Sequence, residues 1–456
     1  MRVRLIQPAH LNPDGTRVRY SELFMPSLSL PTVAALTPPE VDVKITVDYI
    51  EEIDYDEPVD LVGLTAMTFH APRAYQIADE FRRRGKKTIL GGIHAAFCSD
   101  EALTHFDSVM IGEAEDLWEE VLRDARDGRL KKIYSSPRRP DLSRLVIPRF
   151  DLLDYSRYLI PPFARTPCLP LQTTRGCPNT CGFCSVHPFL GNEIRKKPVA
   201  HVVREIEALK PSLVFFTDDN ICADESYARE LFTALIPLRI RWACQMSTTV
   251  LRTPALIDLA ARAGCHETFV GIESINKESL KSARKGFNKV ETYKEVFRRM
   301  KEAGILGQAS FIFGLDQDTP DTLKDTIGTI LGWDIKFLYI FMLVPLPGTR
   351  IHEQFKNEGR IVAADWSLYD AEHPVIAFKN MSARELEDLV WTSYQRFYSI
   401  PHIGRMAWRF KKQYITGFPR TNFFEDVYFQ FTSRRAVRRR MSPWTMGSTI
   451  PHEKES

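Results

Sequence analysis

The sequence predicts an α/β protein with an N-terminal doubly wound parallel sheet, a partial (β/α)6 TIM-type barrel after it, and a helical C-terminal region. Three observations predict this order. Short apolar runs alternate with amphipathic stretches up to about residue 360, a Pro- and Arg-rich segment at 131–167 interrupts them, and helical periodicity continues from 361 to 456. The 456 residues, 44% hydrophobic and 26% charged, suffice for two packed domains and a tail.

The first domain is expected at 1–130. Its apolar runs predict strands at 3–6, 43–48, 61–65, 87–92 and 108–112, and its amphipathic stretches predict helices at about 28–37, 71–84, 99–105 and 115–127. Strands that alternate with helices in this way indicate a parallel sheet, which binds ligands at the carboxyl ends of its strands.

Three loops at these strand ends consist of small or polar residues. They are the segment 63–68 with the hydroxyl of Thr65, the run Gly91-Gly92-Ile93-His94, and the run Gly112-Glu113-Ala114-Glu115. Small residues let a ligand approach the backbone closely. The G-x-G-x-x-G pattern is absent, so the sequence does not support a nicotinamide cofactor.

The segment 131–167 has the composition of an interdomain linker, with prolines that include Pro137, Pro140, Pro161 and Pro162. Strand–helix alternation then resumes within 168–360. The further strands are expected at 169–173, 213–220, 242–247, 267–274, 308–314 and 337–343. They define six βα units in series.

Three cysteines follow the first of these strands: Cys177, Cys181 and Cys184, at C-x3-C-x2-C spacing. Gly176, Pro178 and Gly182 allow a tight loop at the end of the strand, where α/β barrels place their chemistry. Three thiolates this close can bind three irons of one [4Fe–4S] cluster and leave the fourth iron without a protein ligand. A structural zinc loop completed by His187, or three unrelated thiols, are the alternatives.

The cysteine spacing and its setting resemble the radical S-adenosylmethionine (SAM) superfamily. The resemblance implies that the six βα units form an open barrel and that the free iron chelates SAM, which is cleaved reductively to a 5′-deoxyadenosyl radical. It also implies an external electron donor such as flavodoxin or ferredoxin. Residues 345–349, Pro-Leu-Pro-Gly-Thr, resemble the closing loop of the family.

The same resemblance implies roles for polar residues on successive strands. Asp218 and Asp219 would contact the amino group of SAM, Glu273 would hold the ribose hydroxyls, and Gln308 and Ser310 would face the adenine or the substrate. Each carboxylate taken alone could instead cap a helix.

The first domain looks like the cobalamin-binding domain that precedes many radical SAM domains. Gly91, Gly92 and His94 match its Gly-Gly-x-His loop, and Gly112, Glu113 and Glu115 match its Gly-Glu-x-Glu segment. The Asp-x-His-x-x-Gly motif is absent, so cobalamin would bind without a histidine on cobalt. A flavodoxin-like domain that only scaffolds is the alternative.

The C-terminal region begins with Ser382 and Glu385, which are spaced as a capping box. Aromatic residues alternate with Arg and Lys over 405–440. This basic aromatic tail could be a helical cap on the barrel, a membrane-surface helix or an RNA-binding segment. From about Thr445 onward the chain is expected to be disordered.

The bulk composition limits the setting of the protein. The net charge of +3 does not itself imply a polyanion partner, and nucleic acid is not the expected ligand. The five cysteines outside the cysteine loop are scattered, which suits a reducing cytoplasm, and no signal peptide or membrane-spanning run is evident. We therefore expect a cytoplasmic protein, with peripheral contact to a membrane through 405–440 as the alternative setting.

The leading functional hypothesis is a cobalamin-dependent radical SAM enzyme that methylates an unactivated carbon of a small molecule or lipid. A B12-binding radical SAM enzyme that cyclises, contracts or oxidises its substrate is one alternative. A tRNA methylthiotransferase is weaker, because the N-terminal region offers only Cys98 for a second cluster. A zinc-dependent RNA-binding protein is the non-enzymatic alternative.

Overall fold

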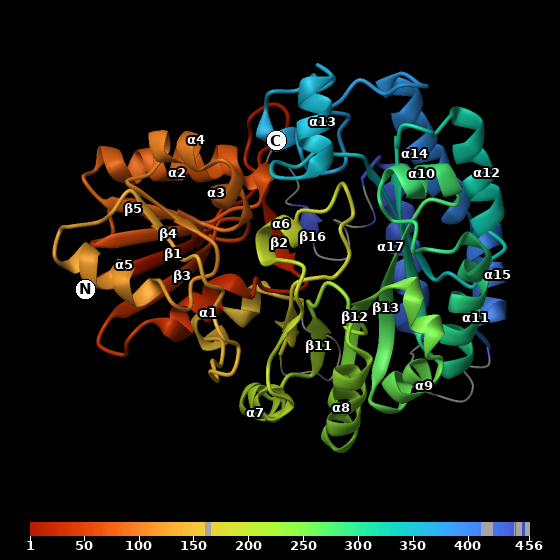
Figure 1. The fold of residues 1–456 in the computed structure, drawn as a ribbon, viewed down its shortest axis with the longest axis horizontal. Coiled ribbons are helices and arrows are strands. Elements are labelled where there is room, and N and C mark those ends of the chain that lie inside the picture. The colour runs from red at the N-terminus through yellow and green to blue at the C-terminus, as the bar shows by residue number, and fades with distance from the viewer. Residues whose placement is uncertain (160–165, 412–422, 442, 444–448, 452–456) are drawn as a thin grey trace.

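The computed structural model describes residues 1–159, 166–411, 423–441, 443 and 449–451, and arranges them as two lobes, each built on a parallel sheet (Figure 1). The predicted linker prolines Pro161 and Pro162 lie outside the described residues. Within the described part of the chain, no helix has both the length and the apolar character needed to cross a membrane.

The N-terminal lobe contains six parallel strands in the order β3-β1-β4-β5-β6-β7. The strands are β1 (Arg2–Gln7), β3 (Asp42–Val47), β4 (Leu61–Thr65), β5 (Lys87–Gly91), β6 (Ser108–Ile111) and β7 (Ile133–Ser135). The helices are α1 (Ser29–Leu36), α2 (Ala71–Arg83), α3 (Ile93–Phe97), α4 (Ser99–His105) and α5 (Trp118–Arg126). Leu5 packs with α1 and α5, and its neighbour Ile6 packs with α2, α3 and α4, so helices cover both faces. The predicted doubly wound sheet is confirmed.

Two elements of this lobe were not predicted. Strand β7 pairs with β6 and extends the sheet into the segment that was expected to be linker, so the sheet runs to Ser135. Helix α3 begins directly after Gly92, and its five residues are too few to show periodicity in the sequence.

The second lobe contains six parallel strands in sequence order from β8 to β15. The strands are β8 (Cys168–Leu171), β11 (Leu213–Phe216), β12 (Arg241–Met246), β13 (Cys265–Glu273), β14 (Leu306–Phe313) and β15 (Phe337–Met342). The α-helices between them are α6 (Val186–Leu190), α7 (Val199–Leu209), α8 (Glu225–Leu235), α9 (Ala255–Arg262), α10 (Lys277–Ser282), α11 (Tyr293–Ala303) and α12 (Pro320–Ile330). Strands β8 and β15 are opposite edges of the sheet, so the barrel is open, as predicted.

The C-terminal helices are α14 (Ala383–Phe397), α15 (Ile400–Arg409) and α17 (Phe423–Arg438). The predicted capping box of Ser382 and Glu385 begins α14. The Tyr394 hydroxyl of α14 bonds the N–H and the C=O of Ile340 on β15, at 2.7 and 3.1 Å. The next residue on this face, Tyr398, does the same for Leu338, at 3.1 Å to each group. These bonds satisfy an edge strand that would otherwise be unpaired.

The end of the chain returns to the N-terminal lobe. Thr449–Pro451 form strand β16, which pairs with β2 (Tyr20–Leu23), so the expectation of disorder from Thr445 is wrong at these three residues. Residues 444–448 and 452–456 lie outside the described part, as do residues 412–422 of the basic aromatic tail.

Candidate active site

The cysteine loop is held at the carboxyl end of the barrel by a short antiparallel pair, β9 (Thr174–Arg175) and β10 (Arg195–Lys196). Gly176 has φ +92°, and a Cβ there would lie 2.2 Å from the carbonyl oxygen of Glu193, so only glycine fits. The N–H of Gly182 donates to the carbonyl of Ala283, and its own carbonyl accepts from the N–H of Ile351, which ties the loop to the end of α10 and the start of α13 (Arg350–Asn357).

Cys177, Cys181 and Cys184 are partly buried in this loop, and burial raises the pKa of the Cys184 thiol to about 12. Among the described residues, no three His, Cys, Asp or Glu side chains are close enough to hold a single metal ion. A cubane needs a wider arrangement, because each thiolate binds a different iron. Three cysteines on one loop at the carboxyl end of the barrel are the donor set that such a cluster uses.

Asp218 and Asp219 follow β11 but have different environments. Asp218 is fully buried, and its carboxylate accepts from the hydroxyls of Thr173 at 2.7 Å and Thr174 at 2.6 Å as well as from their backbone N–H groups. This carboxylate is saturated by the chain leading into the cysteine loop. The predicted contact of Asp218 with SAM does not suit this geometry, which instead makes Asp218 a brace for that loop.

Asp219 is the better candidate for a ligand contact. Its Oδ2 atom is buried and has no hydrogen-bond partner among the described residues. Burial, followed by the charge of Asp218, raises the pKa of Asp219 to about 7. A buried acceptor without a partner is costly unless a ligand supplies the donor. The amino group of SAM would be such a donor, and the contact of Asp219 with SAM stays a prediction.

Glu273 at the end of β13 has a left-handed backbone, with φ +64°. Such a conformation costs energy in a non-glycine residue and is common at functional sites. Its carboxylate pairs with the ammonium of Lys285, which lies 5.8 Å from the centre of the Phe183 ring in the cysteine loop. The contact of Glu273 with ribose stays a prediction.

Lys285 was missed by the sequence analysis. Burial alone would lower its pKa, but the charges of Glu273 and Cys181 outweigh burial and raise it, so the side chain is a cation beside the cysteine loop. It lies in the connection after α10, where no motif marks it.

Gln308 and Ser310 occupy alternate positions on β14. The intervening residues Ala309 and Phe311 pack against the outer helices, so Gln308 and Ser310 face the barrel interior. Their contact with adenine or substrate stays a prediction.

In the N-terminal lobe, Thr65, Gly91 and Gly112 end or follow the neighbouring strands β4, β5 and β6 at one edge of the sheet. Gly92 has φ +92°, and a Cβ there would lie 2.8 Å from the Thr65 hydroxyl. Gly112 has φ +102° with no atom within 4 Å of a Cβ position, so open space lies above it. Gly92 is therefore required by close packing against Thr65, and the backbone of Gly112 borders open space where a cofactor could approach it.

His94 is 1% exposed and holds helices together within this lobe. Its Nε2 atom bonds the Tyr75 hydroxyl at 2.7 Å, and its ring meets the Trp366 ring edge-on at 5.7 Å. Burial lowers its pKa to about 4, so the ring is neutral at pH 7. His94 thus anchors the start of α3 against Tyr75 and Trp366, and its predicted contact with the cofactor stays a prediction.

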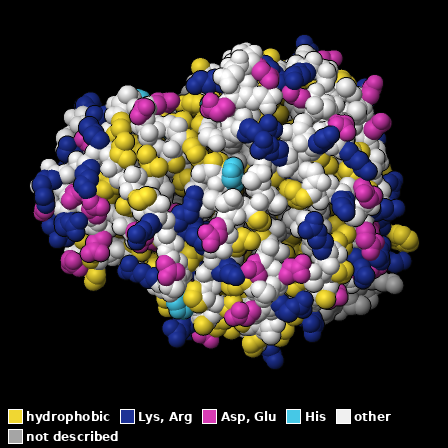
Figure 2. All heavy atoms as spheres, viewed as in Figure 1, with side chains coloured by type: hydrophobic (Ala, Val, Ile, Leu, Met, Phe, Trp, Pro, Cys, Tyr) yellow, Lys and Arg dark blue, Asp and Glu magenta, His cyan; other side chains and the backbone are white. Residues whose placement is uncertain are grey.

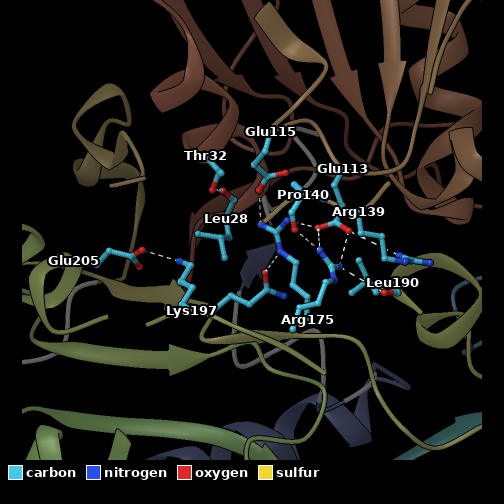
Figure 3. Close-up of polar contacts among 12 residues, drawn as sticks. Leu28, Thr32, Glu113, Glu115, Arg139, Pro140, Arg175, Leu190, Lys197 and Glu205 are labelled. Atoms are coloured by element: carbon cyan, nitrogen blue, oxygen red, sulfur yellow. Dashed lines mark hydrogen bonds and ion pairs between the residues drawn. The ribbon is translucent and has the colours of Figure 1, made fainter. Parts of the chain in front are cut away.

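Glu113 and Glu115 link the two lobes (Figure 3). Arg175 of β9 donates to both carboxylates, and Arg195 of β10 donates to Glu113 at 2.6 Å. Arg139 lies 3.8 Å from Glu113 as well. Glu113 was predicted to contact a cofactor, but its carboxylate is already paired with these arginines. The β9–β10 hairpin, which holds the cysteine loop, is therefore fixed to the N-terminal sheet at the edge where β4, β5 and β6 end.

Two further features lie at this junction. A cavity of about 250 Å³ is lined by Gly112 and Glu113 from one lobe and by Phe189 from the other. The closing loop after β15 reaches across as well, because a Cβ on Gly348 would lie 2.3 Å from the Phe97 ring of α3. The ligand-binding edges of the two sheets therefore face each other.

Fold and site together define a radical SAM enzyme with a B12-binding domain. The Radical SAM superfamily model matches residues 171–330, and the B12 binding domain model matches residues 21–122. The chain is 32% identical over 391 residues to the bacteriochlorophyllide d C-8(2)-methyltransferase of Chlorobaculum tepidum, covering 82% of this chain and 85% of that protein. The chain belongs to the radical SAM superfamily, in the group that carries a B12-binding domain.

The chain is also similar to other curated proteins and, in fold, to solved structures. The hopanoid C-2 methylase of Rhodopseudomonas palustris is 26% identical, with 75% of this chain and 66% of that protein covered. The radical SAM methyltransferase TsrM from Kitasatospora setae, solved with cobalamin and a [4Fe–4S] cluster, has a TM-score of 0.62 at 18% identity, with 78% and 75% covered. The cobalamin-dependent enzyme OxsB has a TM-score of 0.65 at 13% identity, with 94% and 72% covered.

These findings confirm the predicted class, a cobalamin-dependent radical SAM enzyme of the methyltransferase type. They also confirm the predicted cofactors, which are a [4Fe–4S] cluster, SAM and cobalamin.

Proposed function

We propose that this enzyme methylates an unactivated carbon of a large hydrophobic small molecule, a tetrapyrrole or a polycyclic lipid. The proposal on substrate class is supported by the relatives, whose names specify bacteriochlorophyllide d and hopanoids. When bound, the cluster with SAM would supply the radical that removes hydrogen from the carbon, and cobalamin would supply the methyl group.

The residues of this chain divide into three groups in the proposal. Cys177, Cys181 and Cys184 hold the cluster. Asp219 accepts a hydrogen bond from the amino group of SAM, with Glu273, Lys285, Gln308 and Ser310 around the rest of that ligand or the substrate. The residues that would hold cobalamin against the edge of the N-terminal sheet are Thr65, Gly91, Gly92 and Gly112.

The observation that carries the proposal is the contact of Glu113 and Glu115 with Arg175 and Arg195. Arg175 is two residues before Cys177, so the contact fixes the edge expected to hold the methyl donor relative to the loop expected to generate the radical. Methyl transfer needs both at one substrate carbon, and fixed orientation of reacting groups is a large part of catalysis.

The test uses protein reconstituted anaerobically with iron, sulfide and hydroxocobalamin, and supplied with methyl-labelled SAM, a reductant and bacteriochlorophyllide d as probe. We expect labelled product and 5′-deoxyadenosine together, and neither from Cys181→Ala. Release of 5′-deoxyadenosine with an unlabelled, altered product would refute methyl transfer. It would favour the second candidate, oxidation or cyclisation, which is supported by 27% identity to the anaerobic magnesium-protoporphyrin IX monomethyl ester cyclase of Rubrivivax gelatinosus.

Two further proposals concern partners and location. An external donor such as flavodoxin or ferredoxin would reduce the cluster in a reducing cytoplasm. Omitting the donor from a complete reaction would then abolish 5′-deoxyadenosine release. We also propose peripheral contact with a membrane through the basic aromatic tail.

A further inference from the structure

We propose that one face of α15 and α17 binds the surface of an anionic phospholipid membrane. We call this face the arginine–aromatic patch. Its members are Ile400, Trp408, Tyr428, Phe431, Arg434, Arg435, Arg438 and Arg439. The inference deepens the peripheral contact proposed above by naming the residues and the lipid, and it does not depend on methyl transfer.

The patch is unusually apolar for a solvent-facing surface. Trp408 is 67% exposed, Tyr428 63%, Ile400 58% and Phe431 48%. They are four of the nine large hydrophobic residues found exposed in the described part of the chain. The opposite sides of the two helices are packed, since Ile403 and Met406 of α15 and Val437 of α17 are buried. The exposed apolar side chains therefore take no part in packing the two helices against the barrel.

Arginines continue the same face of α17. Tyr428, Phe431, Arg435 and Arg438 follow one another at spacings of three or four residues, which places them along one side of the helix. Residues 427–440 contain five arginines and no Asp or Glu. Within the described residues, Arg435, Arg438 and Arg439 form no ion pair, whereas Arg440 lies 3.7 Å from Asp388.

A groove of about 610 Å³ joins these two features. It is lined by Ile400, Phe431, Arg434, Arg435, Arg438 and Arg439, and the guanidinium of Arg434 also donates to the carbonyl of Tyr398. Apolar walls beside several cations match a lipid, whose phosphate is anionic and whose acyl chain is apolar. In Figure 2, hydrophobic and Lys/Arg spheres lie side by side along the right-hand edge, where Figure 1 places α15.

The patch is remote from the active site. Gln430 of α17 bonds the carbonyl of Lys336, and Arg409 of α15 bonds that of Trp333 at 2.9 Å, both before β15 begins. The start of α17 and the end of α15 thus lie near the amino end of β15, on the outer side of the barrel, whereas the cysteine loop lies at the carboxyl end of the strands. An electron donor docked here would be far from the cluster, and a lipid surface here would leave the active site open.

Lipid is favoured over nucleic acid by the kind of side chains exposed. Trp and Tyr sit at the headgroup level of membranes and Arg binds anionic lipid, while Ile400 offers nothing to a base or a phosphate. The patch then acts as a tether that holds the enzyme where hydrophobic substrates partition.

The test measures cosedimentation of the full-length protein with vesicles of phosphatidylcholine alone or mixed with phosphatidylglycerol. We expect binding to the mixed vesicles only, weaker at high salt. The triple variant Arg435→Glu, Arg438→Glu, Arg439→Glu should bind about a hundredfold more weakly or worse, because each cation near an anionic surface contributes about fivefold. Trp408→Ser with Tyr428→Ser should also weaken binding, and this loss should remain at high salt.

The matched control reverses three exposed arginines elsewhere, Arg123→Glu, Arg126→Glu and Arg262→Glu, with the same change in net charge. It should retain vesicle binding. Equal loss in the control, or no binding of the wild type at low salt, would overturn the inference. Binding of a single-stranded RNA but not of vesicles, lost in the patch variant, would overturn it in favour of nucleic acid. Release of 5′-deoxyadenosine is measured in parallel, so that loss of vesicle binding is distinguished from loss of SAM cleavage.

Discussion

The ion pairs that join the two lobes make a quantitative prediction for Glu113→Gln. The Glu113 side chain is 7% exposed, and those of Arg175 and Arg195 are 14% and 15% exposed. Removing the charge leaves Arg195 without its carboxylate, while Arg175 keeps Glu115. A hydrogen bond to a charged group contributes about 1.5–3 kcal/mol, and the amide of Gln can still accept one of them. We expect the free energy of unfolding to fall by about 2–4 kcal/mol, near the lower end of what breaking a buried pair costs.

The measurement is urea unfolding of the cofactor-free protein, compared with Glu295→Gln. Glu295 pairs with Arg298 on the exposed face of α11, so its replacement should leave stability unchanged. A double-mutant cycle of Glu113→Gln with Arg195→Gln should give a coupling energy of about 1–3 kcal/mol. A loss at Glu113 no greater than that at Glu295 would show that the pairs between the lobes do not hold them together.

Three other predictions test individual side chains. Asp219→Asn should weaken SAM binding by about tenfold or more, because a charge-assisted hydrogen bond is lost; equilibrium dialysis against the reconstituted enzyme checks this, and unchanged affinity would remove Asp219 from the site. Tyr394→Phe should lower the free energy of unfolding by about 1–3 kcal/mol, because the backbone groups of Ile340 lose their partner, whereas Tyr428→Phe on the surface should not. His266 has its pKa lowered to about 3, first by burial and then by Arg241. Between about pH 6.5 and 3, the His266 imidazole is therefore protonated in the unfolded chain but neutral in the folded chain. The free energy of unfolding falls as the pH decreases through this range. His266→Gln should reduce this slope by about 1.4 kcal/mol per pH unit, and an unchanged slope would refute the argument.

The strands of both sheets could be predicted because buried parallel strands are continuous apolar runs. Leu61–Thr65 and Phe337–Met342 are examples, and their predicted bounds agree with the structure to within a residue. Strand β7 could not be predicted. Ile133–Ser135 is short and precedes a proline-rich stretch, and only its pairing with β6 makes it a strand. Non-local pairing of this kind has no signal in the local sequence.

The site could be predicted only in part, because several of its contacts are also made between residues far apart in the sequence. The cysteine loop is a local motif, so its spacing is visible in the sequence. Asp218 and Asp219 are neighbours of one residue type, and nothing local tells which carboxylate the preceding threonines saturate. Lys285 reaches the same loop from a distant connection, and only the folded barrel brings the two together.

The Gly112–Glu115 segment shows how a motif can be found and its role misplaced. The sequence identifies carboxylates at a strand end, but the groups that face them belong to the other lobe. Arg175 and Arg195 lie on the two strands of the hairpin that holds Cys177, so Glu113 is a constraint on that hairpin. Loosening this constraint would let the two ligand-binding edges move independently. Because a radical and a methyl donor must meet one carbon in a fixed geometry, such movement should impair methyl transfer more than it impairs SAM cleavage.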